Sequence, residues 1–342
     1  MTLDPDRRSS LLAAKLRALA GARWPLGDDL RATGFPDGAT LLDRAAARCW
    51  VLVDEGAERR LGGALAVAHR GGAGELHLIV DDPEAGPILA RRASTFASPP
   101  QVWRAEGPEL VAVEAAPPAP DPAPAPEAEL YRPVLRSAGL EPVVEGGHLT
   151  GELRGLEVAR VVVDDSDGSA HIEAGVGRFD REVGAMMFAH LGETDSLTRA
   201  VGIVDRYRSP DAERHPLKHL VPERWLRSGL VAHPELVGAR ELRAVGSAVP
   251  RRNLTEEGVA TAVGVDEDGE DVVVVCSTGV NLDLVPSAAD DRLTHAPGAR
   301  LVLAVPERDA VPITADLAAG LAAPATVATV PGDWRFLTEP TS

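Results

Sequence analysis

Acidic side chains follow the first two strands that the sequence predicts. Glu55 lies just beyond the apolar run 49–53, and Asp82 and Glu84 lie just beyond the alternating run 75–80. Because parallel strands present their carboxyl ends at one edge of a sheet, these oxygens are expected near one another. Carboxylate oxygens are the ligands that Mg²⁺ prefers, and the bound ion can orient phosphate groups. The pattern predicts Glu55, Asp82 and Glu84 as metal ligands, with Mg²⁺ as the candidate cofactor.

A second set of polar residues follows the strands predicted near the end of the chain. Asp283 comes after the apolar run 271–280, and Glu307, Arg308 and Asp309 follow the run 300–306. These four residues occupy the same place relative to their strands as the N-terminal carboxylates. They are therefore candidate catalytic residues. The alternative is that such residues are ordinary solvated turn formers and helix caps.

The N-terminal strand ends also carry a motif. The segments are Val-Leu-Val-Asp-Glu55-Gly and Leu-Ile-Val-Asp-Asp82-Pro-Glu84. Residues 49–105 resemble a Toprim module, the metal-binding unit of topoisomerases, primases and some nucleases, although Asp82-Pro-Glu84 stands where that family has Asp-x-Asp. The resemblance implies divalent-metal-dependent phosphoryl transfer, with Glu55, Asp82 and Glu84 as ligands.

A second motif lies in the middle of the chain. Glu157 ends the segment Gly-Glu-Leu-Arg-Gly-Leu-Glu157, and Glu173 lies in His-Ile-Glu173-Ala-Gly175. Residues 130–190 are similar to a degenerate restriction-endonuclease-like core, in which an acidic residue precedes Glu-x-Lys. The resemblance implies Glu157 and Glu173 as catalytic candidates. Gly175 replaces the lysine, which removes the cation that would stabilise developing phosphate charge.

The segment from residue 199 to 252 departs from the charge of the whole chain. It contains 11 Arg and Lys residues against 6 Asp and Glu residues, whereas the chain has a formal net charge of -17. If these cations share a face, they could bind nucleic acid or an acidic protein. The alternative is that they form salt bridges with the acidic remainder. The candidate phosphate- or partner-binding residues are Arg206, Arg208, Arg214, Lys218, Arg224 and Arg227.

Composition excludes several classes of protein. The acidic balance opposes non-specific attraction to nucleic acid or to an anionic membrane. No apolar run has the length of a membrane span, and charged residues interrupt any N-terminal signal-like stretch. Cys49 and Cys276 each lie inside an apolar run, which favours buried thiols over a disulfide. We expect a cytoplasmic protein without a membrane segment.

The arrangement of predicted elements indicates an α/β protein. Residues 114–129 are rich in proline and alanine and predict an extended linker between an N-terminal domain (1–113) and a C-terminal domain (130–342). Strands beginning near residues 49, 75 and 101, and again near 272, 300 and 325, predict two βαβαβ modules of three strands each. An α+β and helical segment, with a helix predicted over residues 179–190, lies between them. The similar spacing favours duplication, although any two βαβαβ units can show it.

Two functions from different classes follow from these patterns. The first is a non-catalytic regulatory or scaffolding protein that binds another protein. The alternative is a divalent-metal-dependent phosphoryl-transfer or nuclease-like enzyme that acts on nucleic acid. The first is favoured, because each catalytic motif lacks one residue that its chemistry would use.

Overall fold

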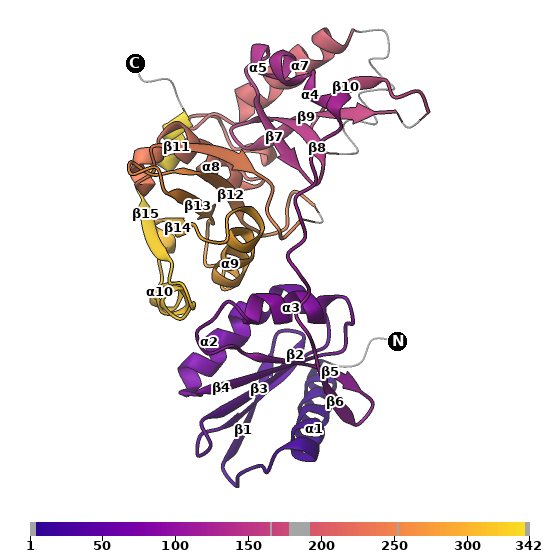
Figure 1. Ribbon diagram of the computed structural model, residues 1–342, viewed down its shortest axis with the longest axis vertical. Helices are drawn as coiled ribbons and strands as arrows, with labels where there is room; N and C mark the ends of the chain where they lie inside the picture. The colour runs from indigo at the N-terminus through magenta and orange to yellow at the C-terminus, as the bar shows by residue number, and fades with distance from the viewer. Residues whose placement is uncertain (1–4, 165, 178–191, 252, 339–342) are drawn as a thin grey trace. The chain divides into compact units, whose positions relative to one another are not determined.

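The computed structural model describes residues 5–164, 166–177, 192–251 and 253–338. The chain forms two compact units (Figure 1). The first contains residues 1–118, 282–290 and 311–326, and the second contains residues 119–281, 291–310 and 327–342. The chain thus contributes three segments to each unit. The domain boundaries drawn from the proline-rich segment stay a prediction.

The first unit is built on a six-stranded sheet whose strands lie in chain order. Strands β3, β4 and β5 are parallel, and β1, β2 and β6 extend the sheet in antiparallel fashion. The strands are β1 (Leu30–Phe35), β2 (Gly38–Asp43), β3 (Arg48–Val53), β4 (Glu75–Val80), β5 (Gln101–Glu106) and β6 (Glu109–Ala112). The helices are α1 (Pro5–Arg23), α2 (Leu61–Gly71) and α3 (Ala85–Ala93).

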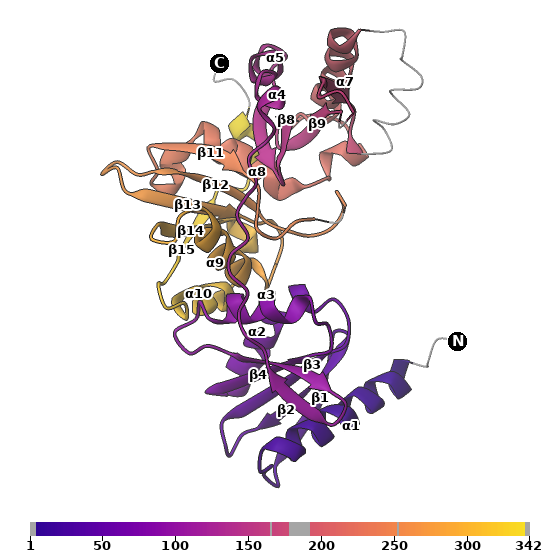
Figure 2. The same cartoon turned by 45° about the vertical axis from the view of Figure 1, so that its right-hand side comes forward.

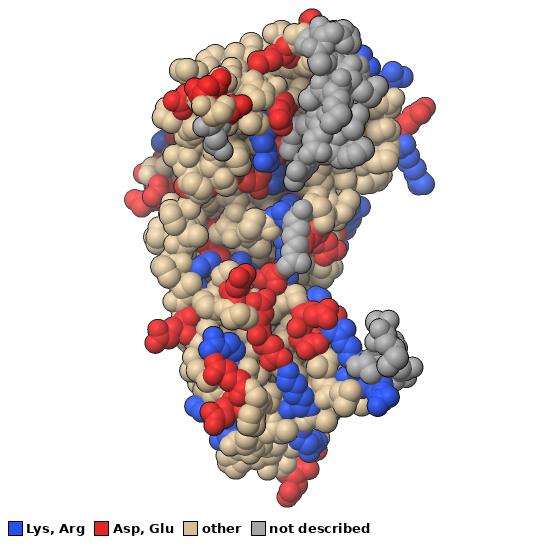
Figure 3. Space-filling model, turned by 90° about the vertical axis from the view of Figure 1, so that its right-hand side faces the viewer, with Lys and Arg blue, Asp and Glu red and all other residues tan. Residues whose placement is uncertain are grey.

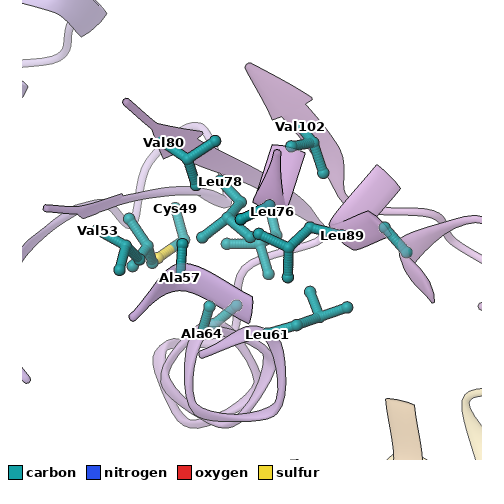
Figure 4. Close-up of a cluster of buried hydrophobic side chains, with 14 residues drawn as sticks. Cys49, Val53, Ala57, Leu61, Ala64, Leu76, Leu78, Val80, Leu89 and Val102 are labelled. Atoms are coloured by element: carbon teal, nitrogen blue, oxygen red, sulfur yellow. The ribbon is translucent and has the colours of Figure 1, made fainter. Parts of the chain in front are cut away.

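Helices cover both faces of this sheet. Side chains alternate along a strand, so neighbouring residues of β3 enter different cores. Cys49 and Val53 pack with residues of α2 and α3, as Figure 4 shows. Trp50 and Leu52 point to the opposite face, where Leu16 of α1 covers them. Burial on both faces explains why β3 is a nearly continuous apolar run in the sequence.

The second unit begins with a four-stranded antiparallel sheet in the order β10-β9-β8-β7. Its strands are β7 (Glu141–Glu145), β8 (His148–Leu153), β9 (Leu156–Val163) and β10 (Ala170–Ala174). The helices that pack on one of its faces are α4 (Pro126–Glu129), α5 (Arg132–Ser137) and α7 (Glu193–Tyr207). The helix predicted over residues 179–190 lies outside the described residues.

Two tight hairpin turns set the register of this sheet. Gly146 and Gly147 join β7 to β8, and Arg154 and Gly155 join β8 to β9, all four with positive φ. Two-residue turns of this kind match the twist of antiparallel strands. A side chain on Gly155 would also collide with the backbone of Arg224, since its Cβ would lie 2.2 Å from the carbonyl oxygen. The second turn therefore places the β8–β9 hairpin directly against the next helix.

That helix, α8 (Pro222–Ala232), packs on a five-stranded sheet in the order β11-β12-β13-β14-β15 (Figure 2). Strands β13 and β14 are parallel, and β11 and β12 extend the sheet in antiparallel fashion. The strands are β11 (Glu241–Val245), β12 (Ala260–Val265), β13 (Asp271–Cys276), β14 (Arg300–Pro306) and β15 (Thr326–Val330). The helices after β13 and β14 are α9 (Leu284–His295) and α10 (Pro312–Ala319).

The predicted α/β class is confirmed. Both three-stranded modules are present, but they belong to different sheets, and each is preceded by two antiparallel strands. The sequence does not predict β1, β2, β8 or β11, which are short and carry many polar or small residues. Among the described residues, no helix is both long and apolar enough to cross a membrane.

Candidate functional site

The charged face of the four-stranded sheet is the candidate site of the second unit. Leu149 and Val158 point to the opposite face, into the core under α4, α5 and α7. Side chains alternate along strands, and a β-bulge in the β8–β9 pairing, which sets Thr150 opposite Arg160 but Glu152 opposite Glu157, brings the polar residues of β8 and β9 to the other face. There they border a cavity of about 320 Å³. The charged and polar residues that line it are Glu145, His148, Glu157, Arg160, Arg224, Arg251 and Asn253.

Glu157, a predicted catalytic residue, is bound by a guanidinium group of its own strand. Arg160 donates from Nε and Nη2 to the two carboxylate oxygens of Glu157, each over 3.0 Å. Glu173, the second candidate of this motif, is directly opposite Arg160 in the β9–β10 register. The fold thus brings Glu157 and Glu173 to neighbouring strands of one sheet. Arg160 binds the first and is paired in register with the second. Arg160 thus neutralises the Glu157 carboxylate, because the fork of the arginine occupies both of its oxygens.

A second part of the face is a network of two arginines and two glutamates, of which only Glu145 is partly exposed. Arg224 binds both carboxylate oxygens of Glu145, and it also donates to Glu152 over 3.3 Å. Arg227, one turn further along α8, donates to the other oxygen of Glu152. The Glu152 side chain is 0% exposed, and that of Arg227 is 3% exposed. The network therefore joins α8 to strands β7 and β8.

The pKa values in this network follow from burial and pairing. Burial alone would raise the pKa of Glu145, but the charge of Arg224 and its hydrogen bonds outweigh burial and lower it. Glu141, on the same strand, has its pKa raised to about 7 mainly by burial, because the charge of Arg227 offsets this only in part. The ion-paired Glu145 is therefore held in its ionised form. Glu141, whose burial is offset less by positive charge, favours its neutral form more than an ordinary glutamate does.

Two further cations of the basic segment are also bound within the chain. Arg208 is 0% exposed and donates to the backbone carbonyl oxygens of Arg154, Leu217 and Leu220 over 2.7 to 3.0 Å. Arg251 binds the buried carboxylate of Glu223. Through these contacts, Arg208 and Arg251 connect the turns that surround α8.

The six predicted phosphate- or partner-binding residues do not form one exposed surface. Arg208, Arg224 and Arg227 are buried. Lys218 is half-buried, and it donates to the carbonyl oxygens of two residues in its own loop. Arg206 is exposed and lies 5.4 Å from the ring of Tyr207, and Arg214 is also exposed.

The predicted metal ligands lie in the first unit. Glu55, 70% exposed, accepts a hydrogen bond of 2.8 Å from Arg8. Asp82 accepts from the backbone N–H groups of Glu84 and Ala85, over 2.8 and 3.2 Å, at the start of α3. The Glu84 side chain is exposed. Within the described parts of the chain, no group of three or more His, Cys, Asp or Glu residues is arranged to hold a metal ion.

The C-terminal strand-end candidates take different positions. Asp283 is half-buried just before α9 and accepts from the backbone N–H of Gly62 over 2.9 Å, and desolvation raises its pKa. Arg308 and Asp309 follow β14 and border a cavity of about 350 Å³ in the second unit. Asp309 accepts from the N–H of Gly279, at the end of β13, over 2.7 Å. Glu307 precedes them in the same 3-10 turn and does not line that cavity.

Sequence reasoning missed Glu145, Glu152, Arg160 and Arg251, which complete the charged face. A signal for part of it is present: polar residues alternate along the segment 148–152. Such alternation predicts strands with one polar face.

The cysteines agree with the prediction of buried thiols. Both are free, and burial raises the pKa of each to about 12.

No protein-family model, curated protein or solved structure matches this chain at a significant level.

Proposed function

We propose that this chain is a non-catalytic regulatory or scaffolding protein of the cytoplasm that binds another protein. The pairing within the charged face carries the proposal. Glu157 is held by Arg160, and Glu152 is held by Arg224 and Arg227. A carboxylate that serves as a base or metal ligand offers its oxygens to water or to the metal. Here guanidinium groups already bind those oxygens, so the charged side chains stabilise the fold.

Exposed apolar side chains offer a binding surface on the helices above the opposite face of that sheet. Leu130, at the end of α4, is 76% exposed, and Val134, one turn later in α5, is 40% exposed. Covering such side chains contributes about 25 cal/mol per Å² of apolar area. These two residues are therefore the proposed contact point for the partner.

Capture experiments test this proposal. The full chain is immobilised and exposed to native lysate, beside a Leu130→Glu variant and a Leu236→Glu control, whose leucine is 39% exposed on a different element. We expect the wild type and the control to retain one partner in stoichiometric amount, and the Leu130→Glu variant to lose it. Equal retention by all three proteins, or none by the wild type, would contradict the proposal.

The nuclease-like function stays a second candidate because of one observation. Glu157 and Glu173 lie on neighbouring strands, with Arg160 opposite Glu173. Against it, acidic and basic side chains are intermixed on the face drawn in Figure 3, without one broad basic area. Metal-dependent cleavage of DNA or RNA by the wild type, lost in a folded Glu173→Gln variant, would establish this second function.

A further inference from the structure

The cavity of about 350 Å³ in the second unit lies where the parallel strands β13 and β14 end. Thr278 and Gly279 follow β13, and Arg308 and Asp309 follow β14; all four line the cavity. Open α/β sheets bind ligands beyond the carboxyl ends of their strands. The volume also falls within the range of about 300 to 1,000 Å³ that is typical of small-molecule sites.

Arg335 reaches this cavity from the C-terminal 3-10 segment Trp334–Thr338. Its guanidinium lies 4.3 Å from the ring centre of Trp334 and 5.6 Å from that of Trp225. The two indoles meet edge to face, 6.2 Å apart, and both are buried. Aromatic packing therefore holds a half-buried cation in one orientation. Its buried Nε has no hydrogen-bond partner among the residues that the structure describes.

A second cation stands close to the first. Arg308 is 70% exposed, and its nearest acidic neighbour is Asp309, with Nε and Oδ1 3.6 Å apart. The other oxygen of Asp309 already accepts from Gly279. Burial, and after it the charge of Arg308, lower the pKa of Arg335. Both effects disfavour the charged guanidinium, and the attraction of an anion placed between the two arginines would offset them.

The remaining charges of the cavity restrict the anion. Glu223, Glu256 and Glu257 also line it, and Glu223 is ion-paired with Arg251. These carboxylates repel a doubly charged phosphate more strongly than a singly charged carboxylate. A carboxylate also matches the planar fork of an arginine.

We propose that this cavity binds a carboxylate ligand, with Arg335 as the anchoring residue and Arg308 as the second donor. The carboxylate could belong to a small organic acid or to the free C-terminus of a peptide. Both ligands carry the carboxylate group that the two arginines would bind. The site is separate from the apolar surface around Leu130, so each proposal can fail without the other.

Calorimetric titration of the full chain tests the site, with four probes at millimolar concentration. They are acetate, a tetrapeptide with a free C-terminus, the same tetrapeptide with an amidated C-terminus, and inorganic phosphate. We expect the free-carboxylate probes to bind and the amidated peptide not to bind. Similar affinities for acetate and the free peptide would indicate a small acid, and a tighter free peptide would indicate a C-terminus.

Variants assign the binding to the two arginines. Arg335→Gln and Arg308→Gln are each expected to weaken carboxylate binding at least tenfold, which corresponds to about 1.4 kcal/mol. Arg335→Lys keeps the charge but loses the fork and should bind with intermediate affinity. Arg240→Gln, which removes a half-exposed arginine outside the cavity lining, should change nothing.

Several results would overturn the proposal. They are the absence of carboxylate binding, equal binding of the amidated peptide, tighter binding of phosphate, or unchanged affinity in Arg308→Gln. The last variant alters a mostly exposed side chain, so its folding is expected to survive even if Arg335→Gln does not fold.

Discussion

Glu152 and Arg227 form an ion pair in which both side chains are buried, 0% and 3% exposed. Arg224 donates to the second oxygen of Glu152 from one turn earlier on α8. Removing one partner of such a pair costs about 3 to 5 kcal/mol, because the other charge is left buried and unpaired. Residues that sequence patterns associate with phosphate binding thus contribute to the packing of a helix on a sheet.

The buried guanidinium of Arg208 gives the first prediction. Arg208→Met leaves the carbonyl oxygens of Arg154, Leu217 and Leu220 without this donor. Each unsatisfied buried group costs about 1 to 3 kcal/mol, so we expect a loss of about 3 kcal/mol or more in the free energy of unfolding. Urea unfolding measures it. Arg206→Met, at an exposed position two residues earlier, should change stability by less than about 0.5 kcal/mol, and equal effects would refute the prediction.

Asp291 of α9 gives a pH dependence. It accepts hydrogen bonds from Ser247, Ala248 and Thr261, but burial raises its pKa from 3.8 to about 6. Between these two pH values, Asp291 binds a proton in the folded chain but not in the unfolded chain. Protonation of Asp291 therefore stabilises the fold at low pH, and this stabilisation is lost as pH rises.

We expect the stability of the wild type relative to Asp291→Asn to fall as pH rises from about 4 to about 6, and then to stay constant. Urea unfolding of both proteins across this range provides the measurement. A constant difference between them would show that Asp291 has an ordinary pKa in the folded chain.

The two cysteines are expected to be inert in the folded protein. Both Cys49 and Cys276 are 0% exposed, and burial raises the pKa of each thiol to about 12. The thiolate is the reactive form, so iodoacetamide at mildly alkaline pH should label neither residue in the native state and both in urea. Mass spectrometry reads the labelling. Rapid modification of native Cys276 would contradict the buried position.

Asp82 is expected to stabilise the turn that leads into α3 and not to bind a metal. Its carboxylate accepts from the N–H groups of Glu84 and Ala85. Asp82→Ala should lower the free energy of unfolding by about 1 kcal/mol, the usual net contribution of a hydrogen bond.

Millimolar Mg²⁺ or Mn²⁺ should leave the melting temperature of the wild type unchanged, because a ligand stabilises only a fold that binds it. Glu109→Ala, which removes an exposed carboxylate of β6 outside the predicted ligand set, is the matched control. A metal-dependent increase in melting temperature that Asp82→Ala removes would support the Toprim-like hypothesis.

Strands that are buried on both faces could be predicted from the sequence. Those ending at Val53 and Cys276 are nearly continuous apolar runs, since neither face meets water. Strand β8 escaped prediction because Thr150 and Glu152 face a charged network while Gly151 faces the core. A polar residue that is buried by pairing looks the same in sequence as one that is solvated.

Whether each arginine is buried or exposed could not be predicted from the net charge of the segment. Arg206 and Arg208 are two residues apart, yet one is exposed and the other is fully buried. The spacing offers a signal, because Arg208 follows the buried Val204 by four residues and thus continues the inner face of α7. Its carbonyl partners come from separate turns of the chain, which no local pattern brings together.

A double-mutant cycle on Glu152 and Arg227 tests most directly whether these charged residues serve the fold. Glu152→Ala, Arg227→Ala and the double variant are unfolded in urea, and the coupling free energy is the departure from additivity. The account predicts a favourable coupling of about 2 to 3 kcal/mol, with both single variants strongly destabilised. A coupling below about 0.5 kcal/mol, the level typical of independent sites, would contradict it.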